Sequence, residues 1–122
     1  MTTTIQSEQS PRVSLLGTTG MLFEPPGEMD LHTQRRIWWL ARQVETWPCI
    51  KEAVPGMSNL MLVFSNPPRD LDPVKADLLA TWSRAEELHL DGRIVELPVI
   101  YGGEYGPHLA DVIAHTGLTI EE

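Results

Sequence analysis

Apolar positions follow two different periods along the chain, and these periods predict its secondary structure. Alternation every second residue is typical of half-buried strands, whereas apolar residues every three or four positions are typical of a helix packed on a core. Alternation predicts five strands, at 13–16, 20–24, 50–54, 60–64 and 93–101. The helical period predicts helices over 31–47 and 72–88, and a short C-terminal helix follows the last strand. The order β-β-α-β-β-α-β favours an α+β fold, with two helices packed on one face of a mainly antiparallel sheet.

Turn and cap residues separate these elements. Asp30 is a good N-cap for the first long helix, and Asp72 followed by Pro73 is a usual start for the second. The Pro-Gly pair at 55–56 is a strong turn signal, and two strands joined by a five-residue turn at 55–59 predict an antiparallel hairpin. Pro98 lies inside the last predicted strand, where a proline removes one ladder hydrogen bond, so a bulge or a sheet edge is expected there.

A glycine-rich loop follows the last predicted strand. Three of the five residues in 102–106 are glycine, which is costly in chain entropy unless the backbone needs unusual angles or a close approach. Pro107 suits the first position of a helix, and Gly117 suits its end. A glycine loop before a helix start can bind an anion, although the Glu104 carboxylate inside the loop disfavours a bare phosphate. The alternative is a turn that joins two domains.

Composition and charge exclude several classes of protein. The 122 residues are 42% hydrophobic and 21% charged, as in an ordinary globular domain, and the formal net charge is −8. With only nine Lys and Arg residues, a nucleic-acid partner is not expected. No apolar run approaches the ~20 residues of a membrane span, and the N-terminus does not resemble a secretory signal. The single cysteine, Cys49, favours a cytoplasmic protein, in which we expect it to be a buried or half-buried bystander.

Recognisable catalytic machinery is absent from the sequence. No nucleophile-elbow motif is present, and no phosphate-binding loop ends in G-K-[ST]. His108, Asp111 and His115 share one face of the last helix, but their spacing does not match a metal motif, so a solvated or interdomain polar face is expected. We therefore expect no metal and no cofactor to be bound by this chain alone.

Four sequence segments carry a resemblance to a known family. They are S-L-L-G-T-T-G-M-L-F-E (14–24), Q-R-R-I-W (34–38), E-A-V-P-G-M-S-N-L-M-L-V-F (52–64) and E-L-P-V-I-Y-G-G-E-Y-G-P-H-L-A-D-V-I-A-H-T-G-L-T-I-E-E (96–122). In this order they resemble the KipI family, which is also named after allophanate hydrolase subunit 1 and the B subunit of 5-oxoprolinase. Two departures stand out: His108 replaces a usual Asp, and Met-Ser-Asn at 57–59 replaces the commoner Tyr-Arg-Ser.

The resemblance implies a domain organisation. Family members have an N-terminal α+β domain followed by a cyclophilin-like β-barrel domain. We accordingly expect a flexible tail at 1–12, the α+β domain at 13–101, and a glycine loop and helix at 102–122 that lead to a missing cyclophilin-like domain. The last residues, T-I-E-E at 119–122, match a helix-opening capping box, which favours a continuation of the chain.

The resemblance also implies a function. It indicates the N-terminal part of a subunit of a heteromeric, ATP-dependent 5-oxoprolinase or carboxyltransferase-like, allophanate hydrolase-type complex that is inactive alone. The implied partner is a second carboxyltransferase-like subunit, of the type of allophanate hydrolase subunit 2 or the C subunit of 5-oxoprolinase, and ATP would act at the level of the complex. The alternative is a regulatory protein that inhibits a sensor histidine kinase. The residues expected to line a ligand site or interdomain cleft are Tyr101, Gly102, Gly103, Glu104, Gly106, Pro107 and His108.

Overall fold

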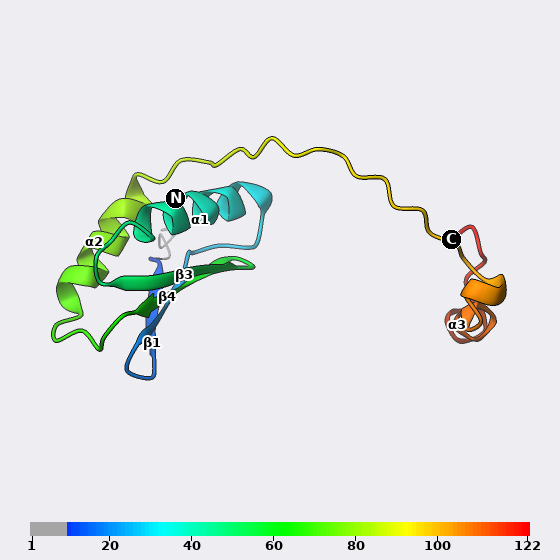
Figure 1. Cartoon of the computed structure of the whole chain (residues 1–122), viewed down its shortest axis with the longest axis horizontal. Helices are drawn as coiled ribbons and strands as arrows, with labels where there is room; N and C mark the ends of the chain where they lie inside the picture. The colour runs from blue at the N-terminus through cyan, green and yellow to red at the C-terminus, as the bar shows by residue number, and fades with distance from the viewer. Residues whose placement is uncertain (1–9) are drawn as a thin grey trace, which may run out of the picture. The chain divides into compact units, whose positions relative to one another are not determined.

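The chain divides into two compact units in a computed structural model that describes residues 10–122. The first unit extends to Leu90, and the second unit is Asp91–Glu122. The first unit contains β1 (Arg12–Leu16), β2 (Gly20–Glu24), α1 (Leu31–Val44), β3 (Ile50–Gly56), β4 (Asn59–Phe64) and α2 (Asp72–Ser83) (Figure 1). The second unit contains η1 (Gly103–Tyr105), a 3₁₀ turn, and α3 (Leu109–Thr116).

The four strands form one antiparallel sheet in the order β1-β2-β4-β3. Cross-strand partners such as Met21 and Leu62, or Phe23 and Leu60, share a face and are almost fully buried. Because side chains alternate between the two faces of a strand, this register places every second residue of β2 and β4 in the core. The period-two pattern predicted these strands for that reason.

Both long helices contribute to the same core. α1 buries four residues at helical spacing, and Figure 1 shows it lying along the sheet with α2 beside it. From α2, Trp82 packs its ring 5.1 Å from that of Phe23, at an interplanar angle of 60°. Arg36 of α1 covers the Trp82 ring at 4.0 Å and donates a 3.2 Å hydrogen bond to the Trp82 carbonyl. The predicted α+β class, with two helices on one face of an antiparallel sheet, is confirmed.

The fifth predicted strand, at 93–101, is absent from the structure. These residues form neither helix nor strand, and Ile94 is 93% exposed. Alternation and β-branched residues make a strand favourable only where a neighbour supplies the hydrogen bonds. Among the described residues, the four strands of the sheet pair only with one another. Pro98, for its part, has no N–H to donate.

Several boundaries also differ from the prediction. α1 ends at Val44 and α2 at Ser83, both earlier than the apolar period suggested. Leu71 precedes α2 as its N-cap, so Asp72 is not the cap but the first helical residue. The backbone N–H of Asp72 donates a hydrogen bond of 3.0 Å to the Asp70 carboxylate. A local side chain thus satisfies the helix start one residue earlier than expected.

Other expectations concern single residues and the tail. Arg12, predicted to be part of the tail, begins β1, and positions 1–9 lie outside the described residues. Cys49 is exposed, so the prediction of a buried or half-buried thiol is wrong; it lies in the short connector before β3, outside the core. Within residues 10–122, none of the helices combines the length and apolar character needed to cross a membrane.

Candidate functional site

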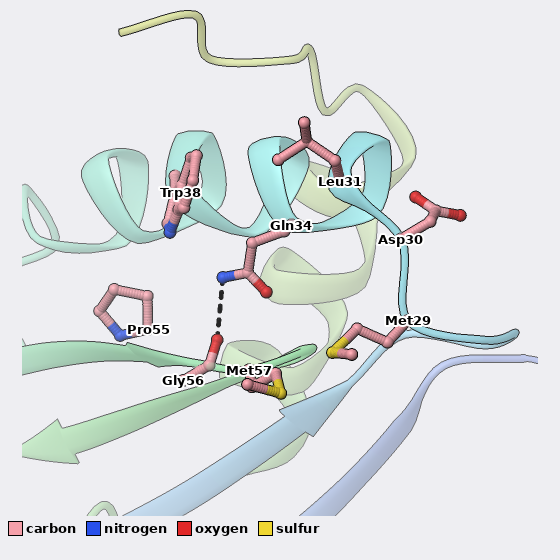
Figure 2. Close-up of a pocket in the computed structure, with 8 residues that line it drawn as sticks. All are labelled: Met29, Asp30, Leu31, Gln34, Trp38, Pro55, Gly56 and Met57. Atoms are coloured by element: carbon pink, nitrogen blue, oxygen red, sulfur yellow. Dashed lines mark hydrogen bonds between the residues drawn. The ribbon is translucent and has the colours of Figure 1, made fainter. Parts of the chain in front are cut away.

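An apolar groove lies in the first unit, between the start of α1 and the β3–β4 turn. Its volume is about 630 Å³, within the range of known ligand and anchor-residue pockets. Figure 2 shows Trp38 and Pro55 to the left of the Gln34 side chain, Met29 to its right and Met57 below it. The groove is lined by Met29, Asp30, Leu31, Gln34, Trp38, Pro55, Gly56 and Met57.

The cap of α1 determines one wall of this groove. Asp30 has extended backbone angles, and its carboxylate accepts the Thr33 N–H at 2.6 Å, as an N-cap residue does. This hydrogen bonding from Thr33 lowers the pKa of the Asp30 carboxyl, because it stabilises the charged form. Met29 precedes the cap, where an apolar residue often packs on the fourth helical position. That position is the polar Gln34, and Met29 remains 60% exposed.

Gln34 connects α1 to the β3–β4 turn. Its amide nitrogen donates to the Gly56 carbonyl at 2.9 Å, and its amide oxygen accepts the Ser58 N–H at 2.8 Å. Ser58 has φ of +56°, the left-handed conformation that costs a residue with a Cβ roughly 1–2 kcal/mol. The two hydrogen bonds therefore hold a strained turn against the helix. The turn also presents Met57, which is 74% exposed.

The chemistry of the groove is that of an apolar binding surface. Asp30 is the single charged residue among those that line it, and no lining residue is cationic. Among the described residues, the Ser58 hydroxyl oxygen is the one buried side-chain polar atom without a hydrogen-bond partner, but Ser58 does not line the groove. The arrangement suits an apolar group and does not suit an anionic small molecule, which needs a cation or a cluster of free N–H groups.

The glycine loop predicted as a site lies in the second unit. Gly102 and Gly103 have φ of +79° and +61°, so both positions favour glycine. A Cβ on Gly106 would meet the Gly102 backbone, and the Gly106 N–H donates to the Gly102 carbonyl at 3.0 Å. A small cavity of about 260 Å³ lies between these glycines and apolar side chains of the same unit, including Leu109 and Ile113.

The side chains of the predicted site do not converge. Tyr101, Glu104, Pro107 and His108 are all exposed, and Tyr101 is 77% exposed. α3 begins at Leu109, so Pro107 precedes the helix, and the prediction that Pro107 is its first residue is wrong. The loop closes a turn there because the Leu109 N–H binds the Gly106 carbonyl at 3.2 Å. That these residues line an interdomain cleft stays a prediction.

The polar residues of the second unit lie on the surface of α3 and at its end. His108 lies 3.7 Å from Asp111 on an exposed helix face, and within residues 10–122 no three His, Cys, Asp or Glu side chains gather as metal ligands would. Gly117 ends α3 in the left-handed conformation, as predicted. The Thr119 N–H donates to the Glu122 carboxylate at 2.9 Å, which is one of the two bonds of a capping box.

Sequence reasoning did not find the groove. Its walls come from two segments that are far apart in the sequence, and each of them alone resembles an ordinary cap or turn. The available signal was an apolar residue, Met57, at the tip of a predicted hairpin turn, where polar residues and glycine are usual. Met29 directly before the N-cap gives a second signal, because an apolar residue is common there but its usual packing partner, the fourth helical residue, is the polar Gln34.

The chain belongs to the family described as carboxyltransferase domain, subdomain C and D, which matches residues 11–122. Within it, the chain is 39% identical over 112 residues to the B subunit of 5-oxoprolinase from Escherichia coli O157:H7, covering 91% of this chain and 51% of that protein. It is also 39% identical over 87 residues to the protein of the same name from Haemophilus influenzae, covering 71% and 40%. The protein of that name from Bacillus subtilis is 29% identical over 124 residues, covering 91% and 52%. The chain thus spans about half the length of the curated relatives it matches.

Proposed function

We propose that this chain is the N-terminal part of a subunit of a heteromeric, ATP-dependent 5-oxoprolinase or closely related carboxyltransferase-like complex. The observation that carries the proposal is the 39% identity to the B subunit of the Escherichia coli 5-oxoprolinase over 91% of the chain. These relatives are named as one subunit of an enzyme, which implies an assembly of several polypeptides. The partner that fits is a second carboxyltransferase-like subunit, of the type of the C subunit of 5-oxoprolinase.

The described residues support a role that depends on those partners. Among them, neither the groove nor the glycine loop contains a nucleophile beside a general base. The glycine loop also does not fit the phosphates of ATP, since Glu104 lies within it and the Gly106 N–H is already bonded to backbone carbonyls. ATP would therefore be bound elsewhere in the complex, and this chain would contribute a surface to the assembled site.

A reconstitution experiment tests the proposal. The complete protein and its partner subunits are purified separately, and ATP-dependent conversion of 5-oxoproline to glutamate is measured for each component and for the mixture. We expect turnover only when this protein and its partners are combined. Turnover by this protein alone would contradict the dependence on partners, and no turnover by any mixture would contradict the enzyme assignment.

The histidine-kinase alternative rests on family resemblance, and no contact in the described residues favours it. The same preparation decides between the two functions. Inhibition of sensor-kinase autophosphorylation, together with no 5-oxoproline turnover in the reconstituted mixture, would replace the enzyme proposal with the regulatory one.

A further inference from the structure

We propose that the groove between α1 and the β3–β4 turn is the docking site for an apolar segment of the second carboxyltransferase-like subunit that carries a Lys or Arg beside its anchor side chain. This inference rests on the proposed function, because it names the surface through which that complex would assemble. The proposed occupant is one stretch of polypeptide, with an aliphatic or aromatic anchor in the groove and a cation at the Asp30 end.

The exposed apolar side chains give the first reason. Met29, Leu31 and Met57 are 60%, 54% and 74% exposed, although they line a common groove. Soluble domains usually leave apolar side chains exposed singly, and a contiguous group around a cavity marks an interaction site. Methionine suits such a surface because its flexible thioether adapts to the shape of a partner.

The preformed wall gives the second reason. Gln34 holds the turn against the helix through two hydrogen bonds of 2.9 and 2.8 Å, and Trp38 follows it one turn later on the same helix face. The groove therefore exists before any partner arrives, which lowers the entropic cost of binding. Its volume of about 630 Å³ accommodates one large anchor side chain with its flanking backbone.

The charge of the groove determines what can enter it. Asp30 is its single charged lining residue, and a hydrogen bond from Thr33 holds the pKa of that carboxyl below its ordinary value, so it stays ionised. Glu28 is exposed two positions earlier in the chain. A basic apolar segment is attracted to this end of the groove, whereas an acidic one is repelled. A second copy of this chain, with a net charge of −8, is the less suitable occupant.

Binding of the purified second carboxyltransferase-like subunit to the complete protein tests the inference, by titration calorimetry at low and at high salt. Met57→Glu places a carboxylate on the apolar wall, and we expect it to weaken binding by about tenfold or more. Asp30→Asn keeps the helix cap but removes the charge; it should weaken binding about threefold at low salt and abolish much of the salt dependence. The matched control is Leu16→Glu on β1, 47% exposed and outside the groove, which should change affinity by less than about twofold.

Each outcome decides one question. If the wild-type protein does not bind the partner, both the complex and the docking site are refuted. If it binds and Met57→Glu binds equally well, the complex stands and the docking site is refuted. Thermal unfolding by circular dichroism verifies that the variants fold. If Met57→Glu does not fold, Met29→Glu is tested in its place. Self-association of the wild-type protein in sedimentation that Met57→Glu removes would instead identify a second copy as the occupant and overturn the proposal.

Discussion

The clamp that Gln34 forms between α1 and the β3–β4 turn can be tested by removing its amide. Gln34→Leu keeps a side chain of similar size and helix propensity but can neither donate to the Gly56 carbonyl nor accept the Ser58 N–H. Both hydrogen bonds are partly buried, so their partners do not regain full hydration when the amide is lost. The turn would then keep the left-handed Ser58 backbone without the interactions that offset it.

The expected loss of stability follows from these contacts. A typical hydrogen bond contributes roughly 1 kcal/mol net, and a donor or acceptor left unsatisfied in a buried position costs about 1–3 kcal/mol. The two bonds of Gln34 are only partly buried and water can reach the turn, so the lower part of that range applies. We expect Gln34→Leu to lower the free energy of unfolding by about 2 kcal/mol.

Equilibrium unfolding in urea, followed by tryptophan fluorescence, measures this change. The midpoint should fall while the slope of the transition stays constant, since the buried surface is nearly unchanged. Gln43→Leu is the matched control, because Gln43 lies on the same helix, is exposed, and makes no side-chain hydrogen bond to the described residues. A Gln34→Leu variant within about 0.5 kcal/mol of the Gln43→Leu variant would refute the clamp.

Three further predictions concern other contacts. Arg36→Met keeps the apolar stem but removes the charge over the Trp82 ring and the bond to its carbonyl, so we expect a loss of about 2 kcal/mol in urea unfolding; a change below about 0.5 kcal/mol would contradict it. Gly106→Ala places a Cβ against backbone, whereas Gly92→Ala meets open space, so thermal unfolding should show a lower melting temperature for the first only. The pKa of the Asp30 carboxyl is lowered in the folded protein, so the stabilising effect of this carboxylate is complete above the ordinary pKa of 3.8. The effect is lost as the pH falls through the lowered pKa. Asp30→Asn should therefore lose less stability than the wild type in an acid titration of the melting temperature, and parallel curves would contradict this.

The first unit could be predicted from the sequence because local pattern and tertiary packing agree there. β2 and β4 alternate between buried and partly exposed residues, and α1 buries residues at helical spacing. In each case the period of the apolar residues reflects a single buried face, and Asp30 caps α1 as its residue type indicates. The relation between sequence and structure is direct wherever each element has its partner nearby.

The segment 93–101 shows where such reasoning fails. Its alternation of apolar residues is genuine, but a strand also needs a neighbour, and hydrogen-bond pairing is a non-local property that no period reveals. Five of its apolar residues are 60–93% exposed, namely Ile94, Val95, Leu97, Val99 and Ile100.

The two candidate sites illustrate the difference between a feature with a structural explanation and a feature without one. The three glycines of the loop are explained by backbone geometry, because two of them have positive φ and Gly106 approaches the Gly102 backbone. Their presence is therefore no longer an argument for a bound anion. The exposed side chains of Met29 and Met57 have no such explanation within the described residues, since a polar residue at either position would satisfy the cap and the turn equally well. Apolar surface that the fold itself does not need is the stronger evidence for a partner, and for this reason the groove, and not the glycine loop, is where the first mutations belong.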